Sequence, residues 1–123
     1  MSKRMKQCRG DLQLLGECRP STRKLILKHC DDKLIQAISD AVYTTLARKV
    51  PLSPQQENRL KKDQTILRQI AAKNRTSKQK RRALATQKGG NIIRFLFNKT
   101  NPIVKNMHKS HFDIILVKMS FTK

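Results

Sequence analysis

The chain has 123 residues and carries 28 Lys and Arg against 8 Asp and Glu, so its formal charge is +20. This length admits one small domain. No run of about eighteen apolar residues occurs, and no apolar run follows the basic N-terminus, so we expect neither a membrane span nor a secretion signal. So large a positive charge repels itself in a folded chain and indicates a polyanionic partner, first nucleic acid and second an acidic membrane surface.

The positive charge is concentrated in one segment. Residues 53–90 contain eleven Lys and Arg against two acids, a net +9, whereas residues 1–20, 21–52 and 91–123 carry +3, +3 and +5. Apolar residues make up 37% of the chain and Trp is absent, so the core must be small and mostly aliphatic. The three cysteines form neither a paired framework nor a zinc motif, which fits a reducing compartment.

Near the N-terminus, apolar side chains recur at steps of three and four residues: Met5, Cys8, Leu12 and Leu15. This spacing lines one face of a helix, but Gly10 and Gly16 lower its helical propensity. We therefore predict a weak helix in a poorly ordered segment, residues 1–20.

A short helix is predicted next, from about Thr22 to His29, after the start signal that Pro20 provides. We expect it to bury Leu25 together with Ile26 or Leu27. A helix of this length is marginal in water and needs a packing partner.

The best amphipathic segment follows the acidic pair Asp31 and Asp32, whose charge suits the positive end of a helix. We predict a helix from Asp32 to about Lys49, ended by the Val50-Pro51 step, because the residue before a proline is disfavoured in helical geometry. Its apolar stripe consists of Leu34, Ile35, Ile38, Ala41, Val42, Thr45 and Leu46.

Two further helices are predicted from capping-box patterns, in which a Ser or Thr cap is followed three residues later by Gln. The pair Ser53 and Gln56 opens a helix from Pro54 to about Lys73, with the proline at the first helical position. The pair Thr76 and Gln79 opens another helix to about Lys88, with Gly89 as its C-terminal cap.

After these helices the sequence changes to two apolar runs, residues 91–97 and 111–119. Periodicity does not decide between strands of a hairpin and short helices for these runs. The pattern as a whole predicts an all-α fold, a small bundle of three to four helices with a poorly ordered N-terminus and an irregular or short-hairpin C-terminal tail. The predicted segments are 1–20, a weak helix, 21–88, a helical basic domain, and 89–123, a Gly-Gly joint with an apolar and basic tail.

The stretch from Arg59 to Lys88 is the candidate nucleic-acid interface, because it holds eleven positive residues against Asp63 alone, whereas ordinary solvated faces mix both signs of charge. Tyr43 is the only aromatic residue of the helical body, and the four Phe lie in the tail. Stacking platforms for single strands are therefore missing, which favours duplex DNA. The predicted phosphate contacts are Arg59, Lys61, Lys62, Arg68, Lys73, Arg75, Lys78, Lys80, Arg81 and Arg82.

Catalytic motifs are lacking in the sequence, which has no glycine-rich phosphate loop before a helix and no nucleophile elbow. We therefore expect no enzyme and no cofactor, and no metal site, because no third ligand accompanies the helically spaced His108 and His111. The peptide Gln87-Lys88-Gly89-Gly90 stands out instead. It is interpreted either as a helix cap with a flexible joint or as a cleavage site at Gly89 and Gly90 for a protease whose narrow subsite excludes side chains.

Five short motifs follow one another in order: Thr22 to Lys28 (TRKLILK), Asp32 to Asp40 (DKLIQAISD), Val50 to Gln56 (VPLSPQQ), Leu67 to Lys73 (LRQIAAK) and Gln87 to Gly90 (QKGG). As an ordered string they resemble the short basic proteins of Maverick or Polinton elements and adintovirus-like animal DNA viruses. The similarity covers about Ser21 to Gly90, over half of the chain, and only the string is fairly specific. From Asn91 onward the sequence departs from the apolar Gly-, Ala-, Leu- and Pro-rich tail of that family.

The resemblance implies a protein of an adenovirus-like gene set, comparable with the basic core peptides that condense packaged DNA. It also implies a protease with Gly-Gly preference in the same gene set, which would cut at Gly89 and Gly90. We therefore expect sequence-nonspecific binding and condensation of duplex DNA in the host nucleus or the virion interior. Capsid proteins, that protease and a second copy of the chain are further candidate partners.

Two other functions stay open at this point. A small bundle exposing the Leu34, Ile38 and Val42 face could dock on a capsid or transposition partner. Alternatively, the chain could be a membrane-active precursor that is cut after Gly90 and whose apolar tail inserts into a bilayer.

Overall fold

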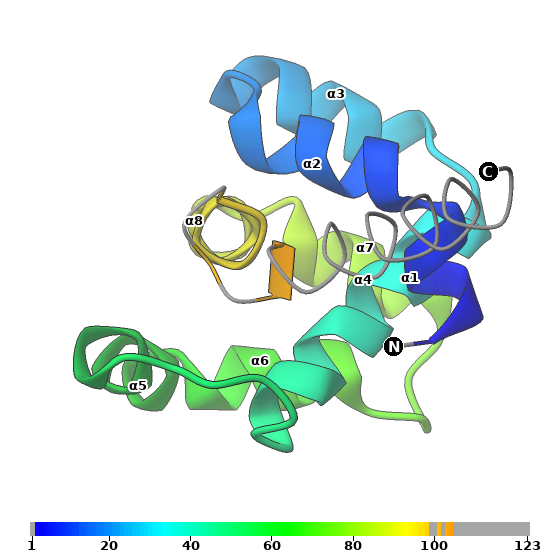
Figure 1. The fold of residues 1–123 in the computed structure, drawn as a ribbon. Helices are drawn as coiled ribbons and strands as arrows, with labels where there is room; N and C mark the ends of the chain where they lie inside the picture. Colours follow the sequence, from blue (N-terminus) through cyan, green and yellow to red (C-terminus); the bar gives the residue numbers. More distant parts are fainter. Residues whose placement is uncertain (1, 99–100, 102, 105–123) are drawn as a thin grey trace, which may run out of the picture.

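The computed structural model describes residues 2–98, 101, 103 and 104, and its regular elements are all helices (Figure 1). They are α1 (Lys3–Gln7), α2 (Arg9–Glu17), α3 (Pro20–His29), α4 (Asp32–Leu46), α5 (Pro54–Lys62), α6 (Gln64–Ala71), α7 (Ser77–Leu84) and α8 (Gln87–Leu96). The predicted all-α class is confirmed for this part of the chain. Its eight helices exceed the three to four that were predicted.

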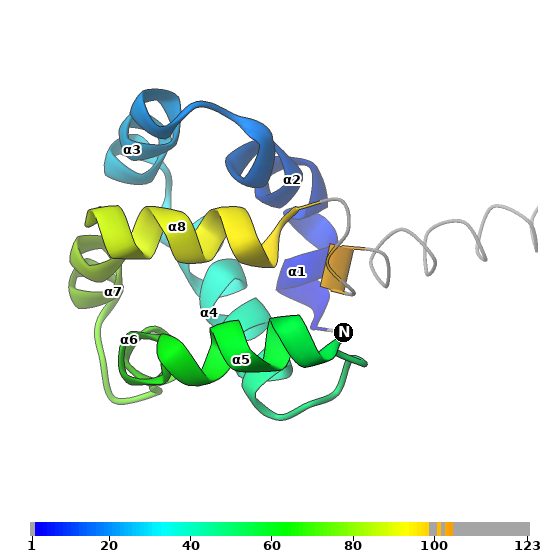
Figure 2. The same cartoon turned by 90° about the vertical axis from the view of Figure 1, so that its left-hand side faces the viewer.

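Helix α4 lies at the centre of the fold and packs against α1, α2, α6 and α7. Helix α8 in turn packs against α2, α3 and α7. In both views, α2 and α3 lie at one end of the molecule and α5 and α6 at the other, with α4, α7 and α8 between them (Figures 1 and 2). The molecule is therefore layered around one internal helix.

The apolar stripe predicted for α4 is confirmed as the middle of the core, with Leu46 partly buried and its other members buried. Burial removes Leu34, Ile38 and Val42 from the surface, because their exposed fractions are 5%, 0% and 0%. The docking face considered for a capsid or transposition partner is thus internal, and that expectation was wrong.

Helix α4 ends three residues earlier than predicted, at Leu46. The backbone N–H of Lys49 donates to the Thr44 carbonyl at 3.2 Å and that of Arg48 to the Thr45 carbonyl at 3.1 Å, which is a Schellman ending. Such an ending needs a residue in the left-handed region, and Arg48 takes it with φ 56°. The prediction missed this stop because glycine usually fills that position.

The N-terminal segment is part of the core, contrary to the predicted weak and poorly ordered helix. Met5, Leu12 and Leu15 are fully buried, and α1 packs on α4 while α2 packs on α8. The Arg4 guanidinium holds the Asp40 carboxylate of α4 through Nε at 2.9 Å and Nη2 at 3.1 Å. The predicted division after residue 20 is therefore not a boundary of packing.

Gly16 explains why the N-terminal glycines do not prevent folding. A β-carbon at this position would collide with the carbonyl group of Phe97, at the end of α8. The glycine thus allows α2 and the end of α8 to approach at backbone distance, and the packing gained outweighs the lower helical propensity of glycine. Gly10, in contrast, has open space around it.

The helix predicted from Pro54 to about Lys73 is divided at Asp63 into α5 and α6. Its predicted start is confirmed, because Ser53 and Gln56 form a complete capping box. Asp63 lies on the apolar side of this segment, at helical spacing from Leu60 and Leu67, and is itself buried. The chain bends where a carboxylate occupies a core position.

The last two helices also differ from the prediction. Thr76 and Gln79 form the expected capping box, but α7 ends at Leu84 and Thr86 caps a new helix, its Oγ1 accepting from the Gly89 N–H at 3.0 Å. Gly89 is therefore inside the first turn of α8 and is not a C-terminal cap. A β-carbon on Gly89 would collide with the Ala83 carbonyl, so this glycine sets the close contact between α7 and α8.

The first apolar run of the tail, residues 91–97, is helical as far as Leu96, so the hairpin alternative is wrong for it. The second run, 111–119, lies outside the described residues, and the predicted division after residue 88 falls inside packed structure.

In α3, Leu27 is buried as expected, whereas Leu25 is 59% exposed. Among the described helices, none has the length and apolar character to cross a membrane.

Gly16→Ala tests the role of the N-terminal helices in the core. We expect this substitution to lower the free energy of unfolding by about 1–3 kcal/mol, because the added methyl group meets backbone that cannot move aside cheaply. Gly10→Ala in the same helix is the matched control and should raise that free energy by about 0.5–1 kcal/mol. Urea denaturation measures both, and equal effects would show that α2 does not pack on the end of α8.

Candidate nucleic-acid interface

Most of the predicted phosphate contacts are exposed. They are positioned by α5, α6, the connection between α6 and α7, and α7 itself. The exposed members are Arg59, Lys61, Lys62, Arg68, Lys73, Arg75, Lys78 and Arg82. Lys80 and Arg81 are the two exceptions.

The acidic side chains nearby leave most of these eight exposed cations unpaired, because their ion pairs are mainly with cations outside this set. Four pairs lie within 3.1 Å: Arg4 with Asp40, Arg48 with Glu57, Arg59 with Asp63 and Arg81 with Asp32. Within the described part of the chain, Arg59 is thus the only exposed member of the set in an ion pair. The other seven keep their full charge toward solvent.

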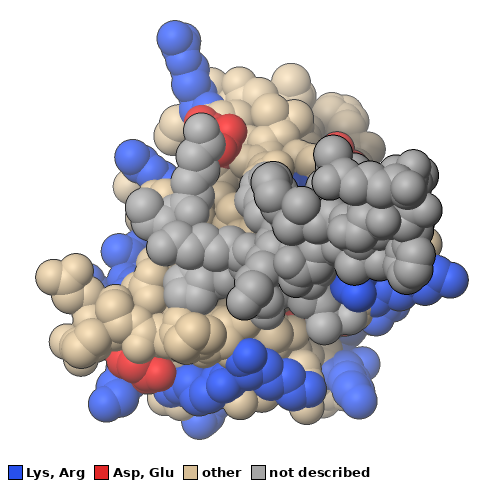
Figure 3. Space-filling model, in the orientation of Figure 1, with Lys and Arg blue, Asp and Glu red and all other residues tan. Residues whose placement is uncertain are grey.

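Lys and Arg side chains gather along the edge of the molecule that α5 and α6 form, at the bottom of the view in Figure 3. Lys61 and Lys62 end α5, and Arg68 lies in the last turn of α6. The apolar side of these helices faces inward through Leu60, Leu67 and Ile70, so the cations are left on the outside. We call this surface the α5–α6 edge, defined by Lys61, Lys62 and Arg68.

A groove between α5 and α8 extends this edge and is lined by Arg59, Lys62 and Lys88. Asp63 lies in the same groove, 3.0 Å from Arg59 Nε and 4.0 Å from Lys88 Nζ, so two of these three cations share one carboxylate. Lys88 was not among the predicted contacts. It enters the groove because Thr86 starts a new helix there, which the sequence interpretation did not include.

A second basic cavity, of about 430 Å³, lies between α4 and the connection from α6 to α7. Lys73 and Arg75 line it together with Arg4, which comes from α1, seventy residues earlier in the chain. Spacing along the sequence could not have revealed this neighbour. Tyr43 also lines the cavity and is 51% exposed.

Lys80 is not a surface contact, which corrects the prediction. Its side chain is buried, and its ammonium donates to the Ser39 hydroxyl at 2.8 Å. The Ser39 hydroxyl in turn donates a hydrogen bond to the Ile70 carbonyl at 2.8 Å. Burial lowers the pKa of Lys80 below its ordinary value; the Asp40 carboxylate opposes this shift, and the Arg4 charge adds to it.

Arg81 also has a structural position, since its side chain is only 22% exposed. Its guanidinium donates to the Leu27 carbonyl at the end of α3 and to Asp32 in the first turn of α4, and it lies 3.3 Å from the Cys30 sulfur. Burial raises the pKa of the Cys30 thiol, although the hydrogen bond from Arg81 opposes that shift. Arg81 thus joins α7 to the turn between α3 and α4.

The Gly89-Gly90 peptide is neither a helix C-terminal cap nor a joint, because it lies inside α8. Gly89 is buried and Gly90 half-buried within the first turn of α8. Cleavage there requires that this helix turn first open, because proteases bind substrates as extended chains. The cleavage itself stays a prediction.

Comparison with known proteins gives no relative to draw on: the chain matches no protein-family model, no curated protein and no solved structure.

Lys80→Met tests the burial of this cation. In the wild type, the unfolded chain keeps the Lys80 proton to a higher pH than the folded chain does. The contribution of Lys80 to the free energy of unfolding therefore rises with pH, from the lowered folded pKa up to the ordinary value of about 10.4. The variant keeps the aliphatic stem but should lose this rise.

Urea denaturation between pH 7 and about 10.5 measures the difference between wild type and variant, which for one proton is at most about 1.4 kcal/mol per pH unit. Lys78→Met, at an exposed position of the same helix, should keep the wild-type pH dependence. Identical pH profiles for Lys80→Met and wild type would contradict the burial of the ammonium.

Proposed function

We propose that this chain binds and condenses duplex DNA through the phosphate backbone without reading its sequence. The observation that supports this most is the set of seven exposed cations between α5 and α7 that have no acidic partner in the described part of the chain. Such cations release the counterions condensed on DNA when they replace them at the phosphates. Binding also relieves the repulsion among the cations themselves.

Contacts of this kind position a protein on DNA but carry no sequence information. The exposed cations are spread over α5, α6, the following connection and α7, and they do not form a row on one helix. Base reading uses a few side chains of a single element inserted in a groove. Cations distributed over several elements are instead suited to contact the phosphate backbone of DNA.

The aromatic residues favour duplex over single-stranded nucleic acid. Among the described aromatic residues, only Tyr43 is exposed. Phe97 is buried, and Phe95 is partly buried with the Arg59 guanidinium 5.8 Å from its ring centre. Proteins that bind single strands stack successive bases on several exposed rings, which the described surface does not offer.

The role in DNA condensation is supported by the five ordered motifs between Thr22 and Gly90, which resemble proteins of virus-derived elements. In that setting the chain would act as a non-enzymatic, core-like protein inside the virion or the host nucleus. Capsid proteins and a Gly-Gly-specific protease are its further partners in this proposal.

Loss of charge on the α5–α6 edge should weaken DNA binding and its salt dependence. For the double variant Lys61→Gln/Arg68→Gln, we expect the plot of log binding constant against log salt concentration to become shallower by about 2, one unit for each lost phosphate contact. Duplexes of two unrelated sequences should give the same slope. Fluorescence anisotropy between about 50 and 200 mM salt measures it.

The matched control is Arg19→Gln/Lys28→Gln, which removes the same charge from exposed positions at the opposite end of the molecule (Figure 1). Its slope should stay close to that of the wild type, because charges separated by more than about 8 Å are largely screened at physiological salt. An equal loss in both double variants would contradict a localised interface. Preference for one sequence would contradict backbone recognition.

A further inference from the structure

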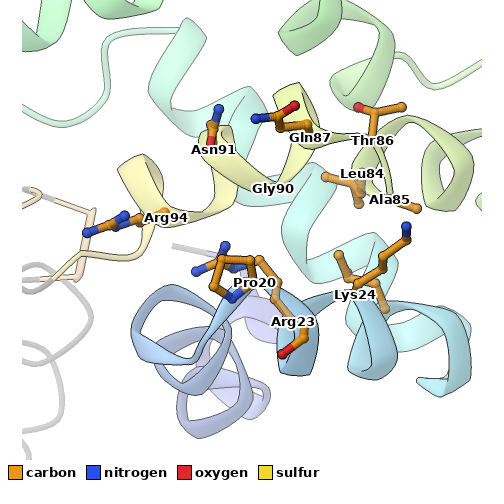
Figure 4. A pocket seen from close by; sticks show the side chains of 12 residues that line it. Pro20, Arg23, Lys24, Leu84, Ala85, Thr86, Gln87, Gly90, Asn91 and Arg94 are labelled. Carbon is orange, nitrogen blue, oxygen red and sulfur yellow. The ribbon is translucent and has the colours of Figure 1, made fainter.

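A groove lies between α3, the end of α7 and α8. Its volume is about 410 Å³, a size typical of sites for small molecules. Figure 4 shows Pro20, Arg23 and Lys24 of α3 on one side and Asn91 and Arg94 of α8 on the other. Three cations and no acidic residue line this groove.

Arg23 is the unusual residue of this groove, because it is 4% exposed and yet has no carboxylate in ion-pair distance within the described part of the chain. Buried arginines are normally paired with an acid. Its Nε donates to the Leu15 carbonyl at 2.8 Å and its Nη2 to the Cys18 carbonyl at 3.0 Å. These bonds fix the guanidinium at the C-terminal end of α2.

The third nitrogen of Arg23, Nη1, faces α8. It lies 3.9 Å from the point where Gly90 would carry a β-carbon, so the absence of that carbon leaves the nitrogen open to the groove. An immobilised guanidinium with a free edge is a preorganised donor for an oxyanion, because little side-chain entropy is lost on binding. The second glycine of the Gly-Gly peptide thus keeps space beside a fixed cation.

Two further cations can help to neutralise an anion that is bound at Arg23. Lys24 and Arg94 are exposed, stand toward the two ends of the groove in Figure 4, and are in no ion pair within the described residues. The wall between them includes the apolar side chains of Leu27, Leu84 and Ala85. The groove therefore combines three cations with an apolar lining.

We propose that this groove binds a phosphomonoester, with the phosphate on Arg23 Nη1 and an uncharged part of the ligand against the apolar wall, while Lys24 and Arg94 supply further positive charge from the two ends of the groove. A terminal phosphate carries close to two negative charges at neutral pH, which suits a groove lined by three cations and no acid better than the single charge of a backbone phosphodiester does. Its source is either a free phosphorylated small molecule or the phosphorylated end of a nucleic-acid strand. The site is independent of the α5–α6 edge, which lies at the other end of the molecule from α3 (Figures 1 and 2).

Isothermal titration of the full chain at about 150 mM salt tests the proposal, because this salt concentration suppresses diffuse anion binding. The ligands are inorganic phosphate, adenosine monophosphate, adenosine, and a short single-stranded oligonucleotide with either a phosphate or a hydroxyl at its 5′ end. We expect saturable one-to-one binding of adenosine monophosphate and at least about tenfold weaker binding of adenosine. A comparable preference for the phosphorylated oligonucleotide identifies strand ends as a source, and its absence assigns the site to small molecules.

Lys24→Gln/Arg94→Gln should weaken binding of adenosine monophosphate about tenfold or more, since it removes two of the three charges from exposed positions. Gly90→Ala should also weaken it, because the new methyl group is in ordinary contact distance of Arg23 and narrows the groove without a clash. Lys61→Gln/Arg68→Gln is the control of equal charge and should leave this affinity within about twofold while it weakens binding of duplex DNA.

Equal binding of adenosine and adenosine monophosphate, or equal losses in the groove variants and the control, would overturn the proposal. The absence of saturable binding of any phosphomonoester would overturn it too. Thermal unfolding of each variant shows that the fold is intact. Because duplex binding is measured on the same proteins, failure of this site is distinguishable from failure of the DNA-binding proposal.

Discussion

The burial of α4 is the constraint on which the rest of this structure depends. A chain with so many charges has few apolar side chains to bury, and it places them around one internal helix that α1, α2, α6 and α7 cover. The polar groups of α4 that lie near this centre have partners on neighbouring elements. The Ser39 hydroxyl donates to the Ile70 carbonyl, and the Asp40 carboxylate accepts from Arg4 of the N-terminal helix. Helices α1, α2, α6 and α7 turn their apolar sides toward this centre, and most of the cations of the chain are left outside, with Arg23 and Lys80 as the buried exceptions.

The positions of the acidic residues explain why the surface of α5 to α7 stays positively charged. Asp32, Asp40 and Glu57 each join two segments of the fold through an ion pair with an arginine, and Asp63 pairs with Arg59 of α5 and with Lys88 of α8. Because the carboxylates are used inside the structure, the lysines and arginines of α5 to α7 have few opposite charges near them. A folded chain of this kind is under electrostatic repulsion, and a polyanion that covers the α5–α6 edge would stabilise it. Folding and the proposed DNA binding are thus linked through the same few acids.

Elements with a local cause could be predicted from the sequence, and elements with a tertiary cause could not. The stripe of α4 and the capping boxes at Ser53 and Thr76 depend on neighbours within a few residues, and all three are confirmed. Gly16 and Gly89 look like helix breakers along the chain, but each permits close contact with a segment that only the fold brings near. In the candidate interface, exposure was predictable for most cations. The burial of Lys80 was not, because its partner Ser39 lies 41 residues away.

The most direct test of the account is a map of which residues respond when DNA binds. Amide chemical shifts of isotope-labelled protein would be followed by nuclear magnetic resonance during titration with two duplexes of unrelated sequence. The account predicts that the same amides shift with both duplexes and that they lie in α5, α6 and the connection to α7, while α2 and the core of α4 stay unchanged. Shifts centred on α2 and α3, or a different set of amides for each duplex, would contradict it.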